Sequence, residues 1–375
     1  MVSRRLMVVF AMSMALAAAR TAPATTYTLH DLGNLGWSAV GKAVSVVNGQ
    51  VEVVGSGQVT SDSGTMSAWY WTQSTGMVNL GAMLAAEYDN PATSYAVTTS
   101  AASGVNSSGQ VFGSFSDSND NTYAFLYSGG TSITKLFSAQ GAVLGTYNLT
   151  DNGTACGIYQ VVVNDLPYTQ GFVCNVNNAG SFTGVGGFGS PATADAFACN
   201  SNGWLTGDMS SGGQHAAIYN GSSWIDIGTL GGSAHGRAID SNGDVVGDNN
   251  TGTKHAWYYS TSTGMVDLGI GSGSYAKGIN DDGQIVGYFG SGPNAYVSGT
   301  APGSYTSLQN TSIVPNLGAF TLTAAWAIDN SGDIVGTGSG DAFLLTPNAV
   351  PEPSTLLLAA SGMAGLLACG WRKRK

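Results

Sequence analysis

The sequence predicts an all-β fold, a repeat β-propeller set between two targeting segments. Three observations lead to this prediction. One short phrase recurs and closes each time on a glycine, with most copies 40–50 residues apart, a period typical of propellers and solenoids. The chain holds 55 glycines but only 9% charged residues, which favours β-structure with many turns. Both ends carry an apolar run beside basic residues.

The first 24 residues have the features of a cleavable signal peptide. Arg4 and Arg5 form a positive start, and residues 6–19 form an apolar run. Small-residue cleavage sites follow, so removal is expected either after Ala19 or after Ala24. We therefore expect residues 1–24 to direct export, and the mature chain to begin outside the cytoplasm.

The repeated phrase predicts a β-hairpin. It runs small residue, aliphatic, Asn or Asp, two polar residues, Gly, polar residue, two aliphatics, Gly. Turns of this composition suit a hairpin because glycine accepts positive φ. The clear copies are 104–113, 238–247, 278–287 and 327–336, weaker copies end at Gly157 and Gly207, and a degenerate copy ends at Gly55.

Two more short strands are expected after most hairpins. Four strands per repeat make one propeller blade, so residues 25–346 are predicted to form seven blades. Six is the main alternative count because the first unit is irregular, and a β-solenoid is the alternative fold. The expected third strands are 68–71, 123–127, 255–259 and 341–345, and the expected fourth strands are 76–81, 224–228 and 264–269.

The chain ends predict how the ring closes. The final unit enters the tail without a fourth strand of its own, and the mature N-terminus begins with a strand at 27–33 that resembles the missing piece. Pairing of strands from both termini would cover an edge that an open stack leaves exposed.

The body resembles the HAF-type extracellular repeats, named for a His-Ala-Phe strand. The likeness covers roughly residues 27–346 and is best at 214–287, where His215-Ala216 and His255-Ala256 carry the characteristic strand. It is weakest at 130–210, so blade boundaries there are open. The resemblance implies an exported repeat protein with no established chemistry.

The exported body is strongly acidic. It carries five basic residues against 21 acidic ones, a net charge of −16. Such a surface repels phosphate backbones, so we expect no nucleic-acid partner. Cys156, Cys174 and Cys199 show no metal-binding spacing; Cys156 and Cys174 are expected on neighbouring strands, either as a disulfide or as small buried apolar residues.

No catalytic motif stands out, so we predict that the protein is not an enzyme. His215 and His255 occupy the same repeat position and are expected to diverge on successive blades, while His30 and His235 lie in stretches that resemble linkers. Strand aromatics such as Trp69 and Trp257 are expected in the core, with sugar stacking as the alternative. The paired aspartates Asp240/Asp244, Asp281/Asp282 and Asp329/Asp333 are expected to shape turns; no cofactor is expected, with Ca²⁺ as the alternative.

The C-terminal segment 347–375 has the features of a sorting tail. Val350, Pro351, Glu352 and Pro353 begin an extended motif, because closely spaced prolines continue neither a helix nor a sheet. The apolar run 356–371 is short for a membrane span, and the basic residues 372–375 resist translocation. The arrangement resembles the PEP-CTERM signal, which implies cleavage near the triplet by an exosortase, a membrane protease.

The sequence therefore predicts a non-catalytic surface or extracellular-matrix protein, transiently anchored in the inner membrane by its C-terminal helix. An exosortase-type protease is the expected partner, with exopolysaccharide as a further one. An enzyme acting on extracellular polysaccharide and a lectin-like glycan-binding propeller are the alternatives.

Overall fold

A computed structural model describes residues 25–348 except 62–63, 90–94, 138–142, 164, 179–181, 187–193, 211–212 and 291–293. The predicted signal peptide, and the sorting tail from residue 349 onward, lie outside the described residues. Within the described residues no helix has both the length and the apolar character of a membrane span. Residues 27–346 form one compact unit.

This unit is built almost wholly from strands. Among the described residues, five sheets have four strands each and one sheet has eight. The four-stranded sheets are β2 (Ser38–Val47), β3 (Gln50–Gln58), β4 (Met66–Thr72) and β5 (Gly76–Asn79); β6 (Val97–Val105), β7 (Val111–Asp117), β8 (Thr122–Tyr127) and β9 (Ile133–Leu136); β18 (Ser233–Ile239), β19 (Val245–Asn250), β20 (Lys254–Ser260) and β21 (Gly264–Asp267); β22 (Ser274–Ile279), β23 (Ile285–Phe289), β24 (Ala295–Ser298) and β25 (Thr306–Ser307); and β26 (Leu322–Ile328), β27 (Ile334–Gly338), β28 (Asp341–Pro347) and β1 (Tyr27–Gly33).

The eight-stranded sheet covers the region where the repeat is weakest. Its two halves are joined by a single parallel pair, Gln170 with Ala194, and each half has the hairpin order of the other sheets. The halves are β10 (Val143–Leu149), β11 (Thr154–Val163), β12 (Leu166–Asn175) and β13 (Thr183–Gly184), then β14 (Ala194–Cys199), β15 (Leu205–Ser210), β16 (Gln214–Tyr219) and β17 (Trp224–Gly228).

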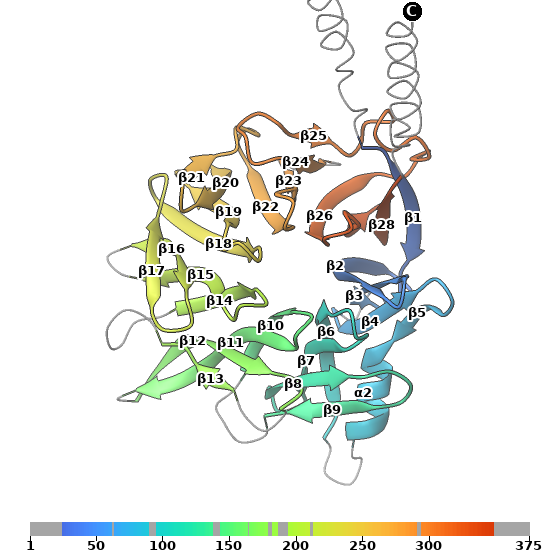
Figure 1. Cartoon of the computed structure of the whole chain (residues 1–375). Coiled ribbons are helices and arrows are strands. Elements are labelled where there is room, and N and C mark those ends of the chain that lie inside the picture. The colour runs from blue at the N-terminus through green and yellow to red at the C-terminus, as the bar shows by residue number, and fades with distance from the viewer. Residues whose placement is uncertain are drawn as a thin grey trace, which may run out of the picture. The chain divides into compact units, whose positions relative to one another are not determined.

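The sheets follow one another around a central opening (Figure 1). The first strand of each hairpin lies innermost, so strands far apart in the sequence face the same centre. These inner strands are β2, β6, β10, β14, β18, β22 and β26. The unit is thus a propeller-like ring of radial sheets.

The repeated phrase forms the predicted hairpins. In the hairpin of β18 and β19, Asp240 Oδ1 accepts hydrogen bonds from the backbone N–H groups of Asn242 and Asp244 at 2.9 and 2.8 Å, and Gly243 has φ of +86°. A Cβ at the closing Gly247 would collide with the His235 carbonyl oxygen and the ring of Trp257. The phrase therefore specifies both the turn and the close approach of the strands.

The aromatic residues of the third strands lie in the core as expected. Trp69 and Trp257 are fully buried and pack in hydrophobic clusters, whereas Tyr70 and Tyr259 are partly buried at the edges of such clusters. Burying rings of this size supplies much of the apolar area that holds a sheet in place.

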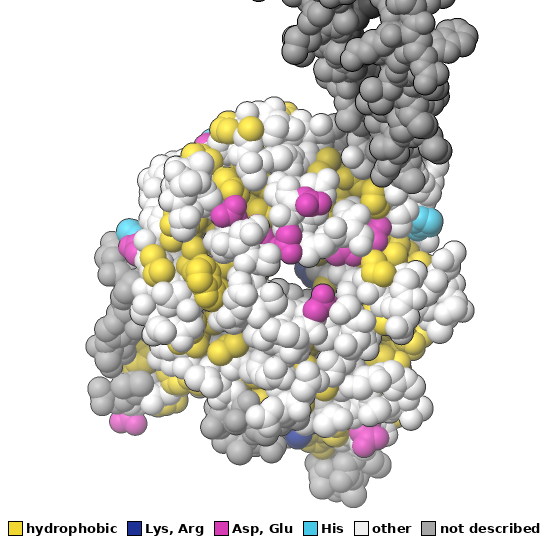
Figure 2. Space-filling model, viewed as in Figure 1, with side chains coloured by type: hydrophobic (Ala, Val, Ile, Leu, Met, Phe, Trp, Pro, Cys, Tyr) yellow, Lys and Arg dark blue, Asp and Glu magenta, His cyan; other side chains and the backbone are white. Residues whose placement is uncertain are grey.

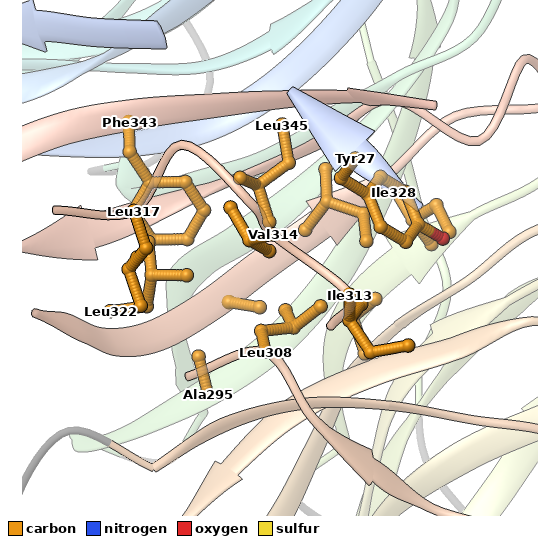
Figure 3. Packing of buried hydrophobic residues seen from close by; sticks show 13 residues of the cluster. Tyr27, Ala295, Leu308, Ile313, Val314, Leu317, Leu322, Ile328, Phe343 and Leu345 are labelled. Atoms are coloured by element: carbon orange, nitrogen blue, oxygen red, sulfur yellow. The ribbon is translucent and has the colours of Figure 1, made fainter. Parts of the chain in front are cut away.

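Strands from both chain ends complete one sheet, as predicted. β1 is hydrogen-bonded to β28, and the backbone N–H of Tyr27 donates to the Ile313 carbonyl at 2.7 Å. Tyr27 is 2% exposed and packs among Val314, Ile328 and Leu345 (Figure 3). The first strand of the unit is therefore covered by apolar side chains of its last strands.

A short helix corrects one prediction. The fourth strand expected at 76–81 ends at Asn79, and α2 (Leu80–Tyr88) follows at once. Asn79 caps this helix, because its side-chain oxygen accepts a hydrogen bond from the Ala82 N–H at 2.9 Å. Leu80 and Leu84 are fully buried, so packing favours the helix.

Candidate functional site: the central cavity

Each inner strand carries a β-bulge at the same place, and β6, β10 and β26 have a second irregularity nearer their first residue. In the pairing of β18 with β19, Gly236 lies opposite Gly247 and Ala238 opposite Val246, so Arg237 has no partner. A bulge re-aims the side chain of the extra residue and is common near functional sites. The corresponding residues of the inner strands, here called the channel ring, are Lys42, Ser103, Tyr147, Phe197, Arg237, Lys277 and Trp326.

All members of the channel ring line one cavity of about 430 Å³. Because equivalent positions close to the axis of a ring converge, residues that are roughly 40 to 60 places apart in the sequence share one space. The volume lies within the range of about 300–1,000 Å³ that is usual for small-molecule sites. The sequence alone did not reveal this cavity.

Cations and aromatic rings contact one another around the channel ring. Lys42 Nζ lies 3.7 Å from the centroid of the Trp326 ring, and Lys277 Nζ lies 5.3 Å from the same centroid. Arg237 Cζ is 4.7 Å from the centroid of Phe197, which packs edge-on against Tyr147 at 5.3 Å. Arg237, Lys277, Trp326 and Lys42 come from consecutive inner strands, and we call these residues the cationic arc.

One carboxylate neutralises part of this charge. Asp248 Oδ1 accepts a hydrogen bond from Arg237 Nε at 2.7 Å, and its Oδ2 accepts one from Lys254 Nζ at 2.6 Å. Burial alone would raise the pKa of Asp248, but the two cations hold that pKa below its usual value. Asp248 is therefore ionised and fully engaged.

The two lysines of the arc have no such counter-charge. Neither Lys42 nor Lys277 has a hydrogen-bond or ion-pair partner among the described residues. Burial lowers the pKa of each to about 8, and for Lys277 the nearby Arg237, Lys42 and Lys254 lower it further while Asp248 opposes them. Three of the five cations of a body with a net charge of −16 thus face one cavity.

The other side of the channel ring is less charged. Asp208 accepts a hydrogen bond from Gln214 and lies 3.1 Å from Nδ1 of His235, while burial raises the pKa of the neighbouring Asp195. Burial, with Asp195 next in effect, raises the pKa of Tyr147 to about 12, so its phenol stays protonated. Positive charge is concentrated in the arc.

The hairpin turns give one mouth of the channel the opposite sign. They line a second hollow of about 340 Å³ that includes Asp151, Asp240, Asp281 and Asp329. Figure 2 shows acidic side chains around the central opening and a basic side chain deeper within it. The channel is thus acidic at the turn mouth and cationic farther in.

The oxygens of the turn carboxylates accept hydrogen bonds from the protein itself. Asp329 Oδ1 accepts from the N–H groups of Ser331 and Asp333 at 2.9 Å. Asp281 bridges two sheets, accepting from Ser241 N–H at 2.9 Å and from Asn330 Nδ2 at 2.7 Å. Among the described residues, no group of three or more His, Cys, Asp or Glu side chains is placed to hold a metal ion.

The histidines lie apart from one another. His215 and His255 pair with Asp226 and Asp267 through Nδ1, at 2.8 and 3.0 Å, the same contact in successive sheets. His235 and His30 both lie in strands, β18 and β1, rather than in the linker-like stretches expected from the sequence. His30, in β1, contacts Thr346 Oγ1 at 3.1 Å.

One histidine belongs to a longer line of hydrogen bonds. His255 Nε2 lies 3.1 Å from Thr253 Oγ1, while its Nδ1 faces Asp267. The order hydroxyl, imidazole, carboxylate is that of an activated nucleophile. The His255 and Asp267 side chains are 29% and 44% exposed, on the outer strands.

The three cysteines that the structure describes are buried free thiols. Cys156 and Cys174 lie on the neighbouring strands β11 and β12, as expected, but neither they nor Cys199 form a disulfide. Burial raises the pKa of Cys156 and also that of Cys174, the latter to about 12. They act here as small apolar residues.

The predicted processing residues Val350, Pro351, Glu352 and Pro353 lie outside the described residues. Comparison with known families nevertheless bears on them: residues 349–375 match the PEP-CTERM protein-sorting motif. The motif implies an exported protein that an exosortase recognises and sorts to the cell surface. A search of curated proteins finds none that matches the sequence.

Solved structures support the fold of the body. The chain is similar to a prolyl endopeptidase (TM-score 0.52, 11% identity, covering 85% of this chain and 51% of that one). It is also similar to puromycin hydrolase (TM-score 0.50, 12% identity, covering 83% and 52%). This chain spans about half the length of these proteins, and at such identity the likeness shows the fold alone. The chain is thus a propeller-like body followed by a PEP-CTERM sorting motif.

Proposed function

We propose that this is a non-catalytic surface or extracellular-matrix protein, which is exported, cut at its tail by an exosortase-type protease and associated with exopolysaccharide. The observation that carries the proposal is the sorting motif at 349–375, which contains Pro351, Glu352 and Pro353. Because the protease supplies the nucleophile, processing needs no catalytic group in this chain.

Each end of the chain has one task in this proposal. Residues 1–24 direct export and are removed. The apolar run 356–371, although shorter than the roughly 20 residues that usually span a bilayer, holds the precursor until the tail is cut, with residues 372–375 on the cytoplasmic side. The extended triplet is then presented to the protease at the membrane surface.

For the body we propose seven blades of HAF-type repeats, residues 25–346. Five four-stranded sheets and the two halves of the eight-stranded sheet support this count, as does the single bulge at the channel-ring position of each inner strand. The pairing of β1 with β28 supports a ring closed by both termini.

The central cavity supports binding more than catalysis. Asp248 is ionised and held by Arg237 and Lys254, so it has neither the proton nor the freedom of a general acid. A lectin-like role is the second candidate. An enzyme is the third, favoured by the Thr253, His255 and Asp267 line, although its exposure leaves water free to enter.

Replacing the triplet tests the sorting proposal. We expect a variant with Pro351→Ala, Glu352→Ala and Pro353→Ala to be exported normally, because export reads residues 1–24, and to accumulate uncut in the membrane fraction. Mass spectrometry of the parent should find a mature C-terminus near residues 350–355. An intact Lys375 in mature surface protein would make the segment a plain anchor instead.

A substitution outside the motif provides the control. Ser354→Ala leaves the triplet intact and should be processed like the parent. Screening the purified mature protein against polysaccharides then separates the classes: bond cleavage that is lost in Thr253→Ala and His255→Ala supports the enzyme, and saturable binding without cleavage supports the non-catalytic classes.

A further inference from the structure

We propose that the cationic arc binds the carboxylate of an acidic sugar, a uronate residue at the end of an extracellular polysaccharide. The inference rests on the proposed association with exopolysaccharide and adds to it a site and a ligand class. It is carried by the placement of Lys42, Arg237 and Lys277 around one cavity.

First, the positive charges of Lys42 and Lys277 are not compensated by a carboxylate among the described residues. Lys42 and Lys277 are packed against Trp326 instead of a carboxylate, and Asp248 is already held by Arg237 and Lys254. The face of an indole ring stabilises a nearby ammonium only partly. An incoming anion would gain charge-assisted hydrogen bonds that the protein itself leaves unmade.

The second step is the position of these cations in the repeat. The chain has few cations in its body, yet three of them stand at one repeat position, the bulge that faces the axis. Cations that served only solubility would be expected on the outer strands, where their side chains face the solvent. Burying lysine costs free energy, which lowers the pKa of both side chains, so packing alone does not favour them.

The third step is what lies across the cavity. The Tyr147 hydroxyl makes no hydrogen bond among the described residues and remains a neutral donor. Phe197, which packs edge-on against Tyr147, adds apolar ring surface on this side. Cations on one side, with a hydroxyl and aromatic surface nearby, suit a ligand that carries both a carboxylate and a sugar ring, rather than a bare inorganic anion.

The acidic turns determine the side of entry. An anion approaching through the turn mouth passes Asp151, Asp240, Asp281 and Asp329, which repel it. The side on which the inner strands begin carries none of these turn carboxylates, and the acidic groups there are Asp195 of β14 and its neighbour Asp208, which contacts His235. A chain end entering there stops at the cations, because the acidic turns oppose its passage through the ring.

Calorimetry on the mature protein purified from its host tests the inference. We expect saturable binding of D-glucuronate and of an oligogalacturonate, and weaker binding of glucose and of inorganic sulfate. In a Lys42→Gln, Lys277→Gln double variant, affinity for D-glucuronate should fall about tenfold or more, since charge-assisted hydrogen bonds are lost. Lys135→Gln, which removes a cation outside the cavity, should change it less than about twofold.

The outcomes separate this inference from the proposed function. Glutamine keeps most of the lysine stem, and an unchanged melting temperature shows that the double variant folds. Absence of saturable D-glucuronate binding, or equal affinity in the parent and the double variant, overturns the site. Sulfate bound as tightly as D-glucuronate overturns the sugar. Correct surface location and C-terminal cleavage would leave the proposed export and sorting standing in each of these cases.

Discussion

The hairpin turns and the channel ring are neighbours on the same inner strands, yet their residues are used in opposite ways. At the turns, Asp240 and Asp329 bond their own backbone, and the same residue types return in sheet after sheet. At the ring the residue changes: three cations, three aromatic residues and one serine in the described inner strands. The repeat thus keeps the residues that build a sheet and varies the one that faces the cavity.

The largest expected effect comes from disturbing the repeated hairpin, whose residues recur in each sheet. In Gly247→Val the added side chain meets the His235 carbonyl and the Trp257 ring, so we expect the free energy of unfolding to fall by about 3 kcal/mol, measured by urea denaturation. Gly213→Ala is the control, because its Cβ would lie at an ordinary 3.5 Å from His215 and should cost less than about 0.5 kcal/mol. Equal losses in the two variants would remove the steric argument.

A smaller loss of stability is expected when the carboxylate beside the channel ring is removed. Asp248→Asn leaves Arg237 and Lys254 without their anion, and we expect about 2–3 kcal/mol of destabilisation in the same assay, since the cations are partly exposed. Asp267→Asn, which removes the exposed partner of His255, should cost under about 1 kcal/mol. If Asp248→Asn is as mild as Asp267→Asn, the arc does not depend on its only carboxylate among the described residues.

The smallest expected effect is a pH dependence of stability that comes from the two lysines of the channel ring. Burial lowers the pKa of Lys42 and Lys277 to about 8, so between pH 8 and 10.5 the unfolded chain binds more protons than the folded one. The stability of the parent should therefore rise by about 2 kcal/mol between pH 8 and pH 9, relative to the Lys42→Gln, Lys277→Gln variant. The same slope in both proteins would show that these lysines are not the cause. The other charged or titratable groups around them are Arg237, Asp248, Lys254, Tyr275 and Tyr288.

Much of the fold follows from the sequence because its signals are local. A turn that ends in glycine and two aliphatic residues specifies a hairpin by itself, and strands such as β20 and β28 were located from their aromatic and apolar residues. The strand at 27–33 was recognisable because the last unit lacked one. The region 130–210 was harder, since its two halves share an eight-stranded sheet and the phrase is degraded there.

The candidate site could not be located in the same way. Its residues stand immediately before the repeated phrase, where the repeat has no fixed residue type, and they meet only because the ring brings its inner strands together. Equivalent residues diverge at outer positions, as His215 and His255 do, whereas near the axis equivalent residues converge. The helix α2 was not predicted from the sequence, because Asn79 suits the end of a strand as well as the cap of a helix.

The closure of the ring also determines the order in which the protein can fold. Contacts such as that of His30 with Thr346 join residues 316 positions apart, so the first strand must wait for the last to be synthesised. Until then, every intermediate carries an unfinished edge and long unclosed loops, which makes folding slow and invites association with other chains. The last strand ends at Pro347 and the sorting motif begins at residue 349, so the ring can be complete before the tail is cut. Cleavage would then release a finished ring and remove no strand from it.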